Sequence, residues 1–189
     1  PGDYQTIPFF DGQFLNRISN LPAGRALTAL VRLLSELAEA EGVALSDPWN
    51  YIAKAAAARP ASGLRANLTF FPTPLGDSGS LTHLREENLT VGDLFRAAFV
   101  NMAENYYASA LRLSPAQNWR RLVFSGGLVQ RLELLQKLIA EKFQREYRLC
   151  PASDDTLQGL LVLALVASGR AASTQAAMEC LRQAQATNL

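Results

Sequence analysis

The stretch that decides the fold is Arg121-Leu-Val-Phe-Ser-Gly126-Gly127-Leu-Val-Gln130, an apolar run that ends in two glycines. Its first part, 122–124, has the β-branched and aromatic character of a buried strand, and the apolar spacing that follows predicts one helix over 128–143. Glycines at the end of a strand let the backbone approach a ligand closely, and the helix N-terminus would direct its amides and dipole at that ligand. This arrangement is typical of one wall of a nucleotide pocket.

The glycine pair also has a simpler interpretation. Gly-Gly between a strand and a helix is more often a tight connection without a ligand. It matches neither the dinucleotide-binding pattern G-x-G-x-x-G nor a P-loop, since no Lys-Ser/Thr pair follows the glycines. The rest of the chain has to decide between the two interpretations.

Composition predicts one globular domain. The chain has 189 residues, of which 49% are hydrophobic and 19% are charged, and this is enough to bury a sizeable core. Its net charge is +1, with 18 basic and 17 acidic residues that form no concentrated patch in the sequence. We therefore expect neither nucleic acid nor a membrane surface as a partner. No run of about 18 uninterrupted apolar residues predicts a transmembrane span.

The two cysteines, Cys150 and Cys180, are too few for a disulfide framework, which favours a reducing, cytoplasmic compartment. His83 is the single histidine, and no partner pattern surrounds it. We therefore predict neither a zinc site nor a Ser-His-Asp triad within the chain. The sequence lacks a signal peptide and begins at Pro1 without a methionine, so we expect a piece of a longer protein.

The order of predicted elements indicates an α/β layout with a long helical insertion. The elements are a hairpin over 4–18, helices over 22–41 and 48–58, an extended segment over 64–71, an irregular connection over 72–88, a helix capped at 90 whose apolar stripe runs to 110, a strand over 122–124, a helix over 128–143, a strand over 147–150, a helix over 156–168 and a polar helix after 169.

Local signals mark several boundaries of these elements. Asp11-Gly12 suits a type I′ hairpin turn, and Asp47-Pro48 suits a helix start. Thr90 is the predicted cap of the third long helix, and either Ser153 or Asp154 is the predicted cap of the helix over 156–168. Because the acidic pair 154–155 stands at that helix start, we interpret it as capping rather than catalytic.

The helix over 156–168 is apolar nearly all round, so we expect it to be buried between other layers. Gly159 lies inside it and costs roughly 1 kcal/mol of helix propensity relative to alanine. Close packing or a nearby ligand would compensate for that cost.

Six short motifs in order resemble the C-terminal part of FGGY-type carbohydrate kinases, and most closely the sedoheptulokinase-like branch, over roughly 4–170. The motifs are Gln5-Thr-Ile-Pro-Phe-Phe-Asp-Gly-Gln-Phe-Leu-Asn16, Pro22-Ala-Gly-Arg-Ala-Leu27, Phe71-Pro-Thr-Pro-Leu-Gly76, Leu89-Thr-Val-Gly-Asp-Leu-Phe-Arg-Ala97, Phe124-Ser-Gly-Gly127 and Asp155-Thr-Leu-Gln-Gly159.

The resemblance implies an actin-like ATPase, ribonuclease-H-type fold, of which 1–170 would be a partial C-terminal lobe with a helical insertion and 171–189 a helical tail. Such kinases transfer the γ-phosphate of ATP, with Mg²⁺, to a sugar hydroxyl, here of sedoheptulose or a related ketose. Gly126 and Gly127 would lie by the adenine and ribose, with Gln130 and Arg131 near the nucleotide.

In that family, the catalytic aspartate and a Gly-Thr-rich phosphate loop come before the hairpin. We therefore expect them, the lobe's first strand, the sugar-binding lobe and most Mg²⁺ ligands to lie upstream of Pro1, so that the fragment alone is inactive. A homodimer is left open.

Two short segments depart from the family pattern. Gly76-Asp77-Ser78 replaces the usual Gly-Glu-Arg, and Leu160 and Leu161 replace small residues. These departures keep open a weakened nucleotide site. Because the expected catalytic residues lie upstream, a non-catalytic regulatory or pseudokinase module that binds a protein partner is a second interpretation. A plain helical α/β domain without a nucleotide site is a third.

Overall fold

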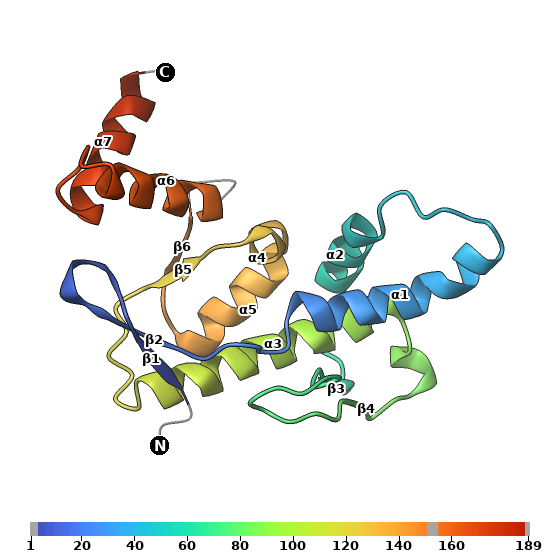
Figure 1. The fold of residues 1–189 in the computed structure, drawn as a ribbon. Coiled ribbons are helices and arrows are strands. Elements are labelled where there is room, and N and C mark those ends of the chain that lie inside the picture. Colours follow the sequence, from blue (N-terminus) through green and yellow to red (C-terminus); the bar gives the residue numbers. More distant parts are fainter. Residues whose placement is uncertain (1–3, 151–154, 188–189) are drawn as a thin grey trace.

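The computed structural model of the chain describes residues 4–150 and 155–187 (Figure 1). These residues form a mixed α/β fold with three two-stranded sheets. The elements are β1 (Gln5–Pro8), β2 (Phe14–Arg17), α1 (Gly24–Ala40), α2 (Pro48–Ala58), β3 (Arg65–Asn67), β4 (Ser80–Thr82), α3 (Val91–Leu113), β5 (Leu122–Phe124), α4 (Gly127–Arg131), α5 (Glu133–Phe143), β6 (Tyr147–Leu149), α6 (Asp155–Ala167) and α7 (Thr174–Thr187). Short 3₁₀ turns lie at Phe10–Gly12 and Glu86–Asn88.

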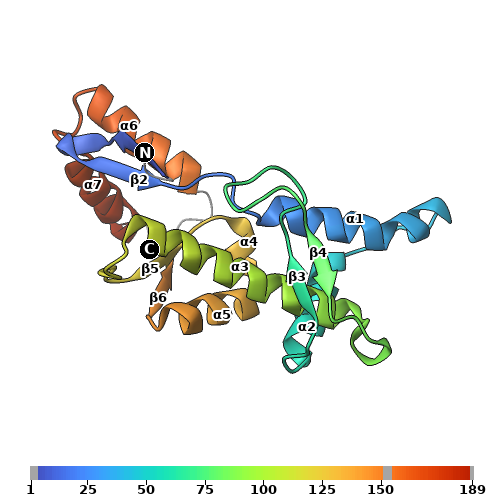
Figure 2. The same ribbon diagram turned by 90° about the horizontal axis from the view of Figure 1, so that it is seen from below.

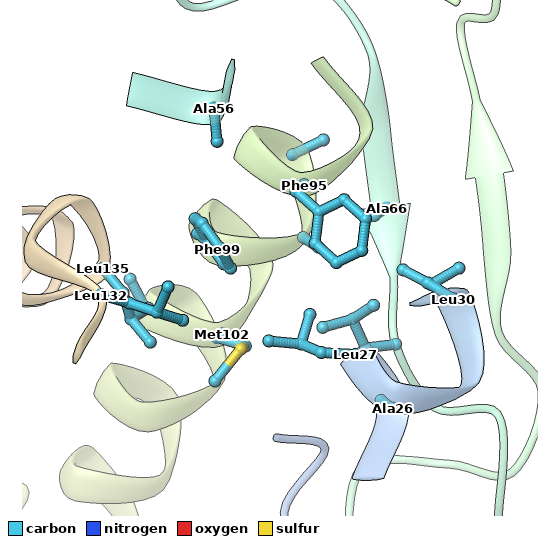
Figure 3. Packing of buried hydrophobic residues seen from close by; sticks show 14 of the residues in the cluster. Ala26, Leu27, Leu30, Ala56, Ala66, Phe95, Phe99, Met102, Leu132 and Leu135 are labelled. Atoms are coloured by element: carbon cyan, nitrogen blue, oxygen red, sulfur yellow. The ribbon is translucent and has the colours of Figure 1, made fainter. Parts of the chain in front are cut away.

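The long helix α3 is the centre of the fold, with α2, α5 and the β3–β4 hairpin packed against it (Figures 1 and 2). Phe95, Phe99 and Met102 of α3 are fully buried. In Figure 3, Leu27 of α1 and Leu135 of α5 approach these side chains from opposite sides. The periodic apolar positions of α3 therefore form the core that joins the two halves of the chain.

Helices α2 and α3 lie close together at Gly92. A Cβ added at Gly92 would lie 2.6 Å from the carbonyl oxygen of Ala55, so the two backbones would have to separate. We expect Gly92→Ala to lower the free energy of unfolding of the full-length protein by about 1–3 kcal/mol, as overpacking does. The matched control is Gly63→Ala, whose Cβ would meet no atom within 4 Å and which should change stability by less than about 0.5 kcal/mol. Equal effects of the two changes in a urea titration would contradict the proposed close approach.

The local boundary signals in the N-terminal half are confirmed. Asp11 and Gly12 have φ angles of 56° and 70°, and the Gln13 N–H donates to the Phe10 carbonyl at 3.2 Å, as a type I′ turn requires. β1 and β2 pair antiparallel on either side of this turn. The Asp47 side chain accepts a hydrogen bond from the Asn50 N–H at 3.0 Å, so it caps α2.

The cap of α3 is confirmed as well. Thr90 Oγ1 accepts from the Asp93 N–H at 3.1 Å and donates to Asp93 Oδ2 at 2.5 Å. Arg59 Nε lies 3.3 Å from the same carboxylate oxygen. The buried Asp93 carboxylate is therefore held by Thr90 and Arg59, and its role is structural.

The prediction of a single helix over 128–143 is wrong, because the structure has two helices that meet at Leu132. The backbone there has φ −105° and ψ 82°, which ends α4 after five residues and starts α5. Gln136 Nε2 donates to the carbonyls of Val129 at 2.7 Å and Gln130 at 3.2 Å. This side chain provides partners that a continuous helix would otherwise provide, and neither glycine nor proline marks the break in the sequence.

The expected burial of the helix over 156–168 is also wrong within the described residues. Leu157, Leu160 and Leu161 of α6 are 63%, 56% and 47% exposed, while Val162 is buried. A Cβ added at Gly159 would meet no atom within 4 Å, so close packing in this part of the chain does not explain that glycine. Ser153 and Asp154, the predicted cap residues, lie outside the described residues.

The strands beside the glycine pair agree with the prediction. β5 pairs in parallel with β6 through α4 and α5, so this part is a βαβ unit. The β1–β2 hairpin lies at the same end of the molecule, in a separate sheet (Figures 1 and 2). Strand β4 lies within 72–88, which the sequence predicts as irregular, and it pairs antiparallel with β3.

In the described part of the chain, no helix is both long and apolar enough to cross a bilayer.

Candidate functional site

The two glycines after β5 have different structural roles. Gly126 has φ 88°, a conformation that side-chain-bearing residues rarely adopt, and its carbonyl accepts from the Gln130 N–H at 3.3 Å. Gly126 is therefore required by the turn itself. A Cβ at Gly127 would meet no atom within 4 Å, so nothing in the described part of the chain requires a glycine at this position.

Gly127 opens onto a cleft of about 550 Å³ between α4 and the start of α2. A cleft of this size lies within the range of small-molecule sites. Its lining comes from two segments far apart in the sequence, namely Asp47, Trp49, Asn50 and Ala53 on one side and Gly127, Leu128, Arg131 and Leu132 on the other.

The structure brings two of the four predicted nucleotide-site residues into this cleft. Gly127 and Arg131 line it, whereas Gly126 and Gln130 do not. Gln130 of α4 is half-buried, and its backbone carbonyl accepts a hydrogen bond from Gln136 Nε2. The break at Leu132 also leaves α4 with only five residues. A helix this short has a small dipole, so its dipole contributes little to binding a ligand here.

The opposite wall of the cleft was not predicted. Trp49 is half-buried, and its ring meets that of Phe95 edge to face with centroids 6.4 Å apart. This contact holds the indole against the core, and Asn50 beside it is exposed. The Asp47-Pro48 signal identifies a helix start there, but no local pattern connects it to α4. Only the packing of α2 on α3 and α5 brings the two walls together.

The electrostatics of the cleft are simple. Arg131 is exposed and forms no ion pair with any described residue, whereas the Asp47 carboxylate is engaged as the cap of α2. The cleft therefore combines an indole, an apolar floor, an exposed amide and a cation without an acidic partner. Such a set suits a flat heterocycle that carries anionic groups.

Perturbed ionisable groups lie outside the cleft. Lys137 Nζ is 2.7 Å from Glu133 Oε1, and this hydrogen bond lowers the pKa of Glu133 and raises the pKa of Lys137. Both side chains are exposed on α5. Burial raises the pKa of Tyr106 on α3. None of these groups lines the cleft, so we assign no acid–base chemistry to it.

Over the described ranges, no group of three or more His, Cys, Asp or Glu side chains is arranged to hold a metal ion. His83 is exposed in a loop, with Nδ1 3.1 Å from Thr82 Oγ1. The residues that line the cleft thus fit the organic part of a nucleotide better than its metal-bound phosphates.

Comparison with known proteins gives a likeness among solved structures. No family model matches the sequence, and no curated protein sequence matches it. Among solved structures, the chain is similar to a xylulose kinase from Rhodospirillum rubrum, with a TM-score of 0.57 and 24% identity.

The match covers 68% of this chain and 26% of the kinase, so the chain spans about a quarter of that kinase's length. At this identity the likeness shows a shared fold. The described α/β fold is compatible with part of a sugar kinase, and the likeness does not single out a sedoheptulokinase-like branch.

Proposed function

We propose that this chain supplies the adenine-side wall of the nucleotide site in an ATP-dependent carbohydrate kinase. The observation that carries the proposal is the cleft that joins Gly127 and Arg131 to Trp49, in a chain whose fold resembles part of a xylulose kinase. Xylulose is a ketose, so we propose sedoheptulose or a related ketose as the phosphoryl acceptor.

Each lining residue has a distinct role in this proposal. The Trp49 indole and Leu128 offer apolar contact to the adenine ring, and the Asn50 amide can pair with its polar edge. Arg131 would attract the ribose–phosphate side of the nucleotide. Gly127 keeps the entrance free of a side chain. Gly126 supports this wall through its turn, and Gln130 supports it through the Gln136 hydrogen bond.

ATP supplies the phosphoryl group, and Mg²⁺ offsets the charge of its phosphates during transfer. The described residues hold no cluster suited to Mg²⁺, so we assign no step of the transfer to them. We propose that the catalytic base, the phosphate loop and the sugar-binding lobe belong to parts of the protein outside this chain. The described residues bind and orient the nucleotide.

Exposed apolar side chains near the β1–β2 and β5–β6 sheets support the proposal that the chain belongs to a larger lobe. Val123 of β5, Phe14 of β2 and Leu157 of α6 are 44%, 71% and 63% exposed. Exposure on this scale, at the end where two separate two-stranded sheets lie, is expected when a further strand and lobe complete the core.

A non-catalytic regulatory or pseudokinase module is the second candidate. Leu160 and Leu161 favour it, because they replace small residues of the family and are 56% and 47% exposed on α6. A coupled assay of the full-length protein against ketoses, polyols and aldoses separates the candidates. ADP formation that depends on a ketose supports the kinase, whereas nucleotide binding without turnover of any sugar supports the second candidate.

The isolated chain is expected to show no sugar-dependent ATP turnover, since its proposed catalytic base and phosphate loop lie elsewhere. The measurement is the same coupled assay on the isolated chain, with the full-length protein as the positive control. Turnover by the isolated chain would mean that catalytic residues lie within it and that the assignment above is wrong.

A further inference from the structure

A second hollow lies on another side of α3, between that helix and the segment that leads into β3. Its volume is about 410 Å³, and it shares no residue with the cleft at Gly127. Its polar lining is formed by Ser62, Arg65, Arg96, Asn101 and Glu104. The remaining lining is small or apolar, so these five side chains determine what the hollow can bind.

Arg96 is the unusual residue in this hollow. Its side chain is half-buried, and its Nε atom is buried without a hydrogen-bond partner. Nη1 donates to the Ala56 carbonyl at 3.4 Å, which is long for a charge-assisted hydrogen bond. Arg96 forms no ion pair with any residue that the structure describes. A partly buried cation without a counter-charge is costly, and a bound anion would remove that cost.

The other polar groups of the lining, apart from Glu104, are also donors. Arg65 is exposed and forms no ion pair within the described ranges. Asn101 Oδ1 already accepts from the Leu68 N–H and from Asn105 Nδ2, each at 3.1 Å, so its own amide N–H groups are what it can offer. The half-buried Ser62 adds a hydroxyl. Two guanidinium groups, an amide and a hydroxyl form a donor set that suits an oxyanion.

The single acid of the lining does not cancel this set. Glu104 lies two helical turns beyond Arg96, about 12 Å along the axis of α3, and it is exposed. No ion pair joins it to either arginine. Arg96 and Glu104 therefore stand apart along the hollow, and the lining holds two guanidinium groups for one carboxylate.

We infer that this hollow binds the oxyanion group, phosphate or carboxylate, of a small metabolite between Arg96 and Arg65. The site is separate from the proposed nucleotide cleft, and the inference does not depend on kinase activity. Arg96 would make the deeper contact, and Arg65 would close over the bound group from the surface.

The test is calorimetric titration of the full-length protein with inorganic phosphate and, separately, with citrate. Sodium chloride keeps the ionic strength constant, and a saturating non-hydrolysable ATP analogue fills the nucleotide cleft. We expect saturable binding of at least one anion. Binding of phosphate would indicate a phosphate-bearing ligand, and binding of citrate would indicate a carboxylate-bearing one. Arg96→Gln should weaken that binding at least about tenfold, and Arg65→Gln should weaken it about three- to tenfold.

Arg112→Gln is the matched control, because Arg112 is an exposed arginine that lies on α3, as Arg96 does, but outside the hollow. This variant should bind the anion as tightly as the wild type does. If Arg96→Gln does not fold by circular dichroism, the exposed Arg65 carries the test alone. The inference is overturned if neither anion binds saturably, if the ATP analogue abolishes binding, or if Arg65→Gln and Arg112→Gln bind equally well.

Discussion

Phe99→Ala is expected to lower the free energy of unfolding of the full-length protein by about 3–5 kcal/mol, a large share of the roughly 5–15 kcal/mol that stabilises an ordinary domain. Phe99 is completely buried, and its ring is 6.2 Å from that of Phe95. Around it, α1, α2 and α5 converge on α3 (Figure 3). Removing the ring leaves a cavity that helices held on several sides cannot close. Urea-induced unfolding followed by circular dichroism gives the change directly.

Tyr51→Ala is the control for this change, since it also removes an aromatic ring but from a side chain that is 63% exposed on α2. Its effect should stay within about 0.5 kcal/mol. A loss below about 1 kcal/mol for Phe99→Ala, or equal losses for both variants, would mean that the core is not organised around α3.

Gly127→Phe in the full-length protein is expected to raise the dissociation constant for ATP at least about tenfold and to leave that for the sugar within about twofold. A Cβ at this position meets no atom of the described chain, so the fold should tolerate the ring. The ring would instead occupy the cleft beside Trp49 and displace the nucleotide base. Separate equilibrium titrations with ATP and with sugar measure the two constants.

Gly127→Ala is the matched control, because a methyl group fills little of a cleft of about 550 Å³. It should weaken ATP binding by less than about threefold. Equal losses of ATP and sugar affinity in Gly127→Phe would count against a role at the adenine side. An unchanged ATP affinity would remove the cleft from the nucleotide site altogether.

The sequence best predicts those features whose determining interactions lie within a few residues of one another. The Asp11-Gly12 turn and the Asp47 and Thr90 caps depend on conformations and hydrogen bonds within a few residues, and the structure confirms all three. The break at Leu132 depends instead on the Gln136 side chain, which reaches back to the carbonyls of α4. Nothing in the apolar periodicity of 128–143 reveals that contact.

The candidate site also has a part that the sequence predicts and a part that only tertiary packing reveals. The strand–glycine–helix pattern predicts the position of Gly127, and the family resemblance adds Arg131. Trp49 and Asn50 lie in a helix whose local signals concern only its start, and tertiary packing alone places them opposite α4. The exposed leucines of α6 show the same limit, because an apolar helix does not specify which layer covers it.

The most direct test of the proposed nucleotide wall is photolabelling of the full-length protein with 8-azido-ATP, followed by mapping of the labelled peptides. We predict that label is incorporated into the segments 47–53 and 126–132, and that excess ATP suppresses it. Label that excess ATP suppresses but that lies wholly outside these two segments would contradict the assignment of this chain to the adenine side of a nucleotide site.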